Sequence, residues 1–144
     1  MGFRRFSLAV GIAVSLMLAV GSGNAASLRV SPISLDLPHG TKASSVRVWN
    51  NDRQPVTVQA RIFRWTRKGG KDILSPTRDV VVSPPIATLA PGAENVIRIV
   101  RTSNRPVEGR EAYRLIVDQI PDRSHDRPGT VRILVRHAIA VIFK

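Results

Sequence analysis

The sequence predicts an all-β protein, a seven-stranded immunoglobulin-like Greek-key sandwich. Three observations predict this fold class. Apolar and polar residues alternate with a period of two in one segment after another. Turn-forming Gly, Pro and Asn residues separate these segments about every ten to fifteen residues. No stretch of the expected domain has the periodicity of an amphipathic helix. The chain has no cysteine, so the Cys…Trp…Cys pattern of antibody domains is absent, but the architecture does not require it.

Residues 1–25 have the organisation of a secretory signal peptide. Arg4 and Arg5 precede the uncharged apolar run 6–20, and Gly23 and Ala25 supply small residues at a cleavage site. The alternative is an uncleaved membrane anchor, but the run is short for a span of about twenty residues. We therefore expect cleavage after Ala25. This leaves one exported domain, residues 26–144, with no membrane span. The absence of cysteine favours a bacterial periplasm over a disulfide-rich secreted scaffold.

The chain is strongly basic, with a formal net charge of +12 that falls to +10 when Arg4 and Arg5 leave with the leader. Such a charge suits nucleic acid, an anionic membrane surface or an acidic partner. The basic residues are spread along the chain, and many alternate with apolar residues inside the expected strands. We therefore interpret the charge as a property of solvated strand faces, and we expect no nucleic-acid partner.

The first half of the expected domain contains three predicted strands. Residues 28–37 alternate around Pro32, which cannot donate a backbone hydrogen bond, so we predict an edge strand with a break or a change of sheet there. Residues 45–50 form the second strand and residues 56–65 the third. In the third strand the apolar parity changes near Ile62, which favours a bulge or a sheet switch. The polar run 67–72 is a hairpin tip.

The second half contains four more predicted strands. Residues 80–89 are extended but interrupted by Pro84 and Pro85, a pair that marks a sheet edge or a crossing. Residues 95–101 and 112–120 are alternating strands. The polar loop 121–128 precedes the last strand.

The last stretch, residues 129–144, is the most informative. Its odd positions are apolar at every place but His137, which is typical of a strand with one buried face. It is about fifteen residues long, whereas most strands have about five or six. We expect another part of the chain or a partner to cover the surplus, because a long apolar edge invites aggregation. We expect His137 to be partly buried and hydrogen-bonded.

No residue pattern indicates an enzyme, so we predict no catalytic residue, metal site or cofactor. His39, His125 and His137 lack the spacing of metal ligands, and no cysteine can join them. No serine lies in a Gly-x-Ser-x-Gly elbow.

Four segments together resemble the N-terminal domain of periplasmic pilus-assembly chaperones, the PapD-like family. The segments are Val48-Trp49-Asn50-Asn51, the Pro-Pro…Leu-x-Pro-Gly run of residues 83–92, the Arg-Glu strand start at residues 110–115, and the long strand of residues 131–143. The strand of residues 59–65 is more similar to the archaic, Csu-type branch of the family.

The resemblance implies a chaperone that binds and stabilises fimbrial or pilin subunits for an outer-membrane usher. It implies donor-strand complementation, in which the chaperone lends its last strand to an incomplete subunit. The matching lent residues are Val131, Ile133 and Val135, while positions 139, 141 and 143 point into the domain's own core. The alternative function is a structural or adhesive immunoglobulin-like module such as a pilin. A pilin would lack its final strand, and here that strand is present.

The sequence departs from the family in two ways. The family holds the subunit's C-terminal carboxylate with two basic residues, and the matching positions are Ser34 or Leu35 and Ala140, none of which is basic. Arg136 is the nearest basic residue on the last strand and is our candidate anchor. The family has a second domain after this strand, and the linker to it would begin at Lys144, where this sequence stops. The second domain is then lost or encoded separately, or the domain has a different use.

Overall fold

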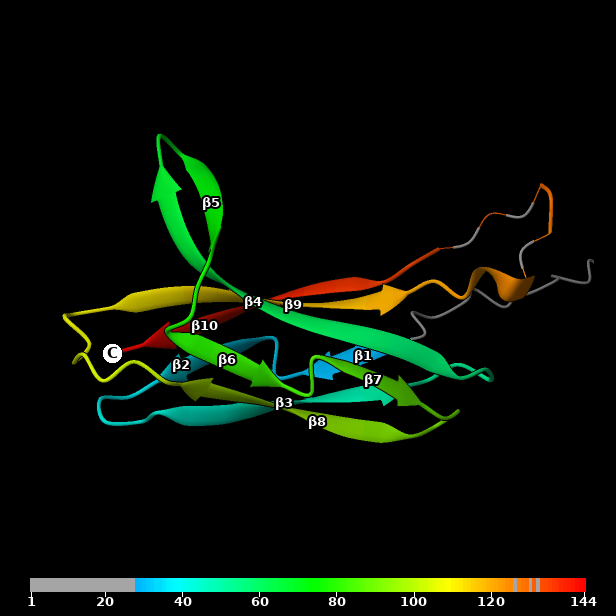
Figure 1. Cartoon of the computed structure of the whole chain (residues 1–144), viewed down its shortest axis with the longest axis horizontal. Helices are drawn as coiled ribbons and strands as arrows, with labels where there is room; N and C mark the ends of the chain where they lie inside the picture. Colours follow the sequence, from blue (N-terminus) through cyan, green and yellow to red (C-terminus); the bar gives the residue numbers. More distant parts are fainter. Residues whose placement is uncertain (1–27, 126, 130, 132) are drawn as a thin grey trace, which may run out of the picture.

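A computed structural model describes residues 28–125, 127–129, 131 and 133–144, and the expected signal peptide lies outside them. Within these residues, ten strands form two sheets packed face to face (Figure 1). The strands are β1 (Leu28–Ser31), β2 (Ser34–Leu37), β3 (Ala43–Asn50), β4 (Val56–Lys68), β5 (Lys71–Pro76), β6 (Val80–Ser83), β7 (Ile86–Leu89), β8 (Glu94–Arg101), β9 (Glu111–Ile120) and β10 (Arg136–Phe143). The one helical element described is a short 3₁₀ turn, η1 (Arg123–His125), so no helix among these residues could span a bilayer.

The two sheets confirm the predicted all-β sandwich. Sheet A has the strand order β1-β3-β8-β6, and sheet B has the order β2-β10-β9-β4-β5 with β7 also paired to β4. Strands distant in sequence are neighbours, as a Greek-key sandwich requires. Seven strands were predicted. Two of those seven are each divided between the sheets, and β5 was not predicted.

The two divided strands change sheet at prolines, as the sequence indicated. β1 pairs with β3 in sheet A, and after Pro32 the chain continues as β2 beside β10 in sheet B. β6 pairs with β8 in sheet A, and after Pro84 and Pro85 β7 pairs with β4 in sheet B. The Ser31–Pro32 and Ser83–Pro84 peptide bonds are both cis. Proline cannot donate to a ladder, so both ladders stop at these residues.

The structure of β4 contradicts the bulge or sheet switch that was predicted, and β4 pairs with β5, a strand that was not predicted. It pairs with β9 in one unbroken register from Thr57 to Arg64, so the bulge or sheet switch expected near Ile62 is absent. The alternation of burial ends there because β4 leaves the sandwich, not because its backbone is distorted. Beyond that point β4 pairs with β5, and this hairpin rises away from both sheets (Figure 1). We call residues 65–76 the arm.

The predicted hairpin tip lies at the end of the arm. Gly69 and Gly70 have φ angles of 59° and 75°, the left-handed region in which glycine avoids a steric penalty. Every residue of β5 is exposed. Alternation is therefore missing from β5, and alternation is the signal by which a strand is recognised in sequence.

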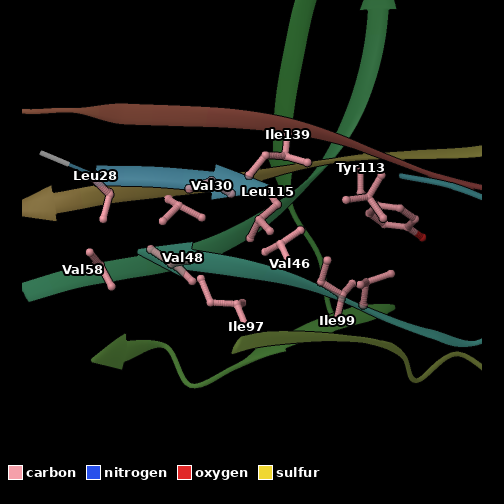
Figure 2. Packing of buried hydrophobic residues seen from close by; sticks show 14 of the residues in the cluster. Leu28, Val30, Val46, Val48, Val58, Ile97, Ile99, Tyr113, Leu115 and Ile139 are labelled. Atoms are coloured by element: carbon pink, nitrogen blue, oxygen red, sulfur yellow. The ribbon is translucent and has the colours of Figure 1, made fainter. Parts of the chain in front are cut away.

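Side chains from both sheets fill the space between them (Figure 2). Val46 and Val48 of β3 and Ile97 and Ile99 of β8 contribute from sheet A, and each is almost completely buried. From sheet B, Tyr113, Leu115 and Val117 of β9, Ile139, Val141 and Phe143 of β10, and Val56, Val58 and Ala60 of β4 are buried. The Tyr113 and Phe143 rings meet edge to face, with centroids 5.8 Å apart. This core fixes β10 against β9 and positions the candidate site.

Candidate functional site

The last strand is shorter in the structure than the sequence predicted. β10 begins at Arg136 and pairs with β9 over its whole length. One more backbone bond, from the Gln119 N–H to the Val135 carbonyl oxygen, extends the ladder by a residue. The described residues of 127–135 otherwise form no strand, so the strand expected over residues 129–144 was wrong in its extent. An alternating sequence does not become a strand without a neighbouring strand to supply its hydrogen bonds.

Burial along this stretch divides the predicted apolar parity into two groups. Ile139, Val141 and Phe143 are buried in the domain's own core, which confirms that prediction. Val131 and Ile133 continue the same parity but are 88% and 81% exposed. Val135 lies at the boundary, since it is half-buried and packs against the edge of the core. Figure 1 shows the chain before β10 projecting past the end of the sandwich, which agrees with the exposure of Val131 and Ile133.

His137 marks the point where β10 enters the sandwich. Its side chain is half-buried, and its Nε2 lies 2.9 Å from the carbonyl oxygen of Leu28. The expectation of a partly buried, hydrogen-bonded histidine is confirmed. The bond ties the first residue of β1 in sheet A to the last strand of sheet B, which explains a polar residue on an otherwise apolar parity.

One edge of β10 is open over half of its length. β2 runs parallel to β10 and pairs only with Ala140 to Phe143. Residues 136–139 therefore have β9 on one side and no strand among the described residues on the other. An open strand edge presents unpaired N–H and C=O groups to an extended chain. Next to exposed apolar side chains at alternate positions, such an edge can bind a partner strand by β-augmentation.

Arg136, the candidate anchor, is engaged with the domain's own residues. Its Nη2 lies 3.0 Å from Asp118 Oδ2, and Arg61 Nη2 lies at the same distance from that oxygen. The Arg136 side chain is largely exposed, so the pair contributes little to stability. Asp118 nevertheless holds the guanidinium over β9.

The two positions expected for basic anchors face each other, as Ser34 and Ala140 are register partners. An open hollow lies over them, and Arg110 and Lys144 also line it. Lys144 Nζ is 2.7 Å from Asp36 Oδ2. Arg110 is exposed, and no ion pair to it is found among the described residues. Sequence reasoning missed Arg110, because it precedes β9 and only the fold brings it to β2 and β10.

No group of three or more His, Cys, Asp or Glu side chains in the described part of the chain is arranged to hold a metal ion. The candidate site is thus an open strand edge with exposed apolar side chains, beside a hollow that carries cationic groups. It can bind a chain and an anion, and we assign it no covalent chemistry.

A sequence model of the family described as "Pili and flagellar-assembly chaperone, PapD N-terminal domain" matches residues 27–144. The chain belongs to this family. A relative of known function, "Chaperone protein CssC" of Escherichia coli, is 26% identical over 109 residues, which cover 69% of this chain and 44% of that protein.

Two solved structures show the same fold. One is the CsuC–CsuE chaperone–tip adhesion subunit pre-assembly complex from the archaic chaperone-usher Csu pili of Acinetobacter baumannii, with a TM-score of 0.70 and 28% identity over 81% of this chain and 56% of that one. The other is the Salmonella enterica SafA pilin in complex with the SafB chaperone, with a TM-score of 0.65 and 21% identity over 83% of this chain and 55% of that one. The chain therefore spans about half the length of the relatives it matches.

The family's Trp-Asn-Asn segment has a structural explanation. The Asn50 side chain is completely buried where β3 ends. Its Nδ2 lies within hydrogen-bond distance of the carbonyl oxygens of Gln54, Leu89 and Ala90, and its Oδ1 accepts from the Asp52 N–H. Asparagine is the small side chain with both two donors and an acceptor, so this one side chain joins the turn after β3 to the end of β7 and the turn that follows β7.

The Arg-Glu segment at the start of β9 also has a structural explanation. Glu111 accepts two bonds from the buried Arg101 guanidinium, at 3.0 and 2.8 Å, and one from the Tyr113 hydroxyl at 2.9 Å. The bonds from Arg101 hold the pKa of the Glu111 carboxyl below its ordinary value, more than burial raises it. Burial, together with the Glu111 bond, raises the pKa of Tyr113 to about 12. The network fixes the start of β9 beside Arg110.

Proposed function

We propose that this chain is a periplasmic chaperone domain that binds and stabilises fimbrial subunits by donor-strand complementation, for assembly by an outer-membrane usher. The observation that carries the proposal is the pair of exposed apolar residues, Val131 and Ile133, beside the open edge of β10. Membership of the chaperone family supports it. The function needs no covalent chemistry, cofactor or metal.

The proposed contact has two physical parts. The open edge of residues 136–139 and the stretch before it offer backbone hydrogen bonds to a subunit strand. Val131 and Ile133 would enter the subunit's apolar groove, and covering each fully would contribute about 1.5–3 kcal/mol. Val135 is already half-buried in this domain, so we assign it to the boundary between the lent stretch and the core.

The alternative, a pilin-like structural or adhesive module, is less well supported. A pilin that takes part in strand exchange needs an open groove where its own final strand is missing. Here β10 occupies that place between β9 and β2. The domain therefore has a strand end to lend, and no groove that awaits one is visible in its core.

We also propose that the subunit's C-terminal carboxylate binds in the hollow above Ser34 and Ala140. Two cations compete for the role of anchor. Arg136 was the residue expected from sequence, but it is already paired with Asp118, which it shares with Arg61. Arg110 lines the hollow without such a partner among the described residues. We expect Arg110→Gln to weaken subunit binding more than Arg136→Gln does, in a binding assay with a purified chaperone–subunit pair.

The central test is the double substitution Val131→Asp and Ile133→Asp. Both side chains are exposed in the free domain, so the variant should fold with an unchanged circular dichroism spectrum. It should fail to co-purify with a fimbrial subunit of the same organism co-expressed in the periplasm, because each carboxylate would enter an apolar groove unpaired. A matched control is Val81→Asp with Ile86→Asp, which changes two other exposed apolar residues.

Four results decide the test. Subunit capture by the double variant would refute the strand-lending mechanism, and so would equal loss in the Val81 and Ile86 control. Val141→Asp should instead unfold the domain, since Val141 is completely buried. A folded Val141 variant would show that β10 is not part of the core. Failure of the wild-type chain to retain any fimbrial subunit would refute the chaperone function itself.

A further inference from the structure

The outward face of sheet A carries three exposed arginines, one on each of three adjacent strands. Arg29 lies on β1, Arg47 on β3 and Arg98 on β8. We call these residues, with Trp49 and Val96 between them, the arginine face. None of its residues takes part in the candidate site on sheet B.

The strand register places the three arginines along a diagonal. Arg29 is opposite Trp49, whereas Arg47 is opposite Val96 and Arg98 is opposite Ser45. Each arginine is thus a diagonal neighbour of the next, about 7–8 Å away between backbones. The side chains directly opposite Arg98 on both sides are serines, which are too short to cover its guanidinium. The face presents a row of accessible cations.

The strand arginines of sheet B differ, because acidic side chains neutralise several of them. Arg61 and Arg136 share Asp118, and Arg64 is paired with Asp79. On the arginine face, the Arg29 guanidinium lies over the Trp49 ring at 4.6 Å, a contact that leaves its charge in place.

Arg47 and Arg98 form no ion pair that is found among the described residues. The single acid in these cross-strand rows is Glu94, which lies opposite Trp49 and is a diagonal neighbour of Arg47. Three arginines against one acid leave this face with a net positive charge.

Apolar side chains alternate with these cations. Val96 and Val81 are 45% and 44% exposed on the same face, and Trp49 is half-buried. A nucleic-acid duplex would neutralise the arginines but would offer no apolar layer to the valines. The interface of a bilayer supplies both, since headgroup phosphates lie directly above the acyl chains and tryptophan prefers that region.

We propose that the arginine face binds the anionic surface of a phospholipid bilayer. Sheet A forms one side of the sandwich, and the arm rises on the other side with sheet B (Figure 1). β10 belongs to sheet B, so a chain bound to lipid through sheet A keeps its open edge available. This proposal rests on the outward face of sheet A and does not depend on the proposed chaperone function.

The test is vesicle sedimentation with the protein exported from its full-length gene and purified from the periplasm. The wild type should bind vesicles that contain phosphatidylglycerol and should not bind vesicles of phosphatidylcholine alone. The triple variant Arg29→Gln, Arg47→Gln, Arg98→Gln should bind the anionic vesicles at least about tenfold more weakly, since each arginine near such a surface contributes severalfold to binding.

A matched control removes the same charge elsewhere. Lys68→Gln, Lys71→Gln and Arg123→Gln change the tip of the arm and η1, outside sheet A, and should alter binding by less than about twofold. The Arg47→Gln, Arg98→Gln double variant keeps the Arg29–Trp49 contact, so it replaces the triple variant if that variant fails to fold. All variants have the same N-terminal sequence, so a difference in vesicle binding between two variants comes from the substituted residues.

Four results would overturn the proposal. They are wild-type protein that does not bind phosphatidylglycerol vesicles, equal binding to neutral vesicles, an equal loss in the control variant, and displacement from the vesicles by an equal phosphate concentration of random duplex DNA. An equal loss in the control variant would assign vesicle binding to net charge, and displacement by duplex DNA would assign it to polyphosphate binding. Weaker binding by the face variants alone would support it.

Discussion

At the scale of single residues, Asn50 holds the turn after β3 against the end of β7 and the turn that follows it. Its side-chain nitrogen faces three backbone carbonyl oxygens, at 2.8, 3.0 and 3.2 Å. Asn50→Asp keeps the size of the side chain but turns a carboxylate oxygen toward these carbonyls. We expect a loss of at least about 3 kcal/mol in the free energy of unfolding, measured by urea titration. The exposed Asn51→Asp is the control, and equal losses at both positions would contradict a role for the buried amide.

The buried pair of Arg101 and Glu111 makes stability depend on pH. The folded-state pKa of Glu111 is lowered, so the stability that this carboxyl supplies is present above its unfolded pKa of about 4.5 and is lost as pH falls through the folded value. Glu111→Gln should lower the free energy of unfolding at pH 7 by about 3 kcal/mol, because Arg101 stays buried without its partner.

Below about pH 4.5 the difference between wild type and the Glu111 variant should shrink, since the wild type then loses the same charge. Urea unfolding at several pH values measures this difference. A gap that stays constant as pH falls would show that Glu111 acts through shape and not through charge.

The sequence predicted the positions of side chains well where burial alone determines them. The period-two pattern gave the last strand one apolar face, the family resemblance assigned Ile139, Val141 and Phe143 to the core, and the structure confirms that assignment. It could not separate Val135 from Ile133, because both are β-branched residues on the same parity and only the end of the facing sheet distinguishes them. Arg110 left no signal, because its position in the hollow comes from contacts between segments far apart in sequence.

At the scale of elements, the arm is a ribbon that the core does not need. Each residue of β5 is exposed, and the Arg67–Asp72 ion pair near the tip lies at the surface. The base is held by Arg114, whose guanidinium lies 3.9 Å from the centroid of the Trp65 ring. The arm is therefore held together by the hydrogen bonds between β4 and β5 and by this contact, and little apolar surface is buried in its outer half.

We expect that replacing residues 67–72 with Asn-Gly will leave the domain folded. Thr66 and Ile73 are register partners, so a two-residue turn can join them. The free energy of unfolding in urea should change by less than about 1 kcal/mol, because the deleted residues are exposed. A larger loss would show that the arm packs on the sandwich. As a control, Trp65→Ala should cost more, since it removes the contact with Arg114 at the base.

The prolines show how local chemistry sets the larger topology. Pro32 and the Pro84-Pro85 pair end their ladders, and at each the chain passes from sheet A to sheet B. A residue that cannot donate a hydrogen bond is recognisable in sequence, which is why an interruption was predicted at both places, with a sheet crossing as one of the two alternatives at each. β5 was not predicted, because a strand with no buried face carries no alternation.

At the scale of the whole molecule, the fold class followed from alternation and turn spacing, but the partition of charge did not. The sequence shows that basic residues are spread along the chain. Only strand pairing shows that sheet B neutralises several of its arginines while the cross-strand rows of sheet A hold three arginines and one acid. Cross-strand neighbours come from distant segments, so the net charge of a face cannot be added up along the sequence.

We expect the mature protein to begin at Ala26, close to the first strand of the sandwich. Leu28 is buried, and its carbonyl oxygen is bonded to His137, so the sandwich is anchored within three residues of the expected cleavage site. A domain that starts at Ala26 would keep every described core contact, and the apolar run of residues 6–20 would serve export alone. We expect the protein purified from the periplasm to have the intact mass of residues 26–144. A soluble cytoplasmic product that retains residues 1–25 would contradict this. Replacing Ala25 by a bulky residue should cause unprocessed protein to accumulate, because signal-peptide cleavage requires small residues at that position.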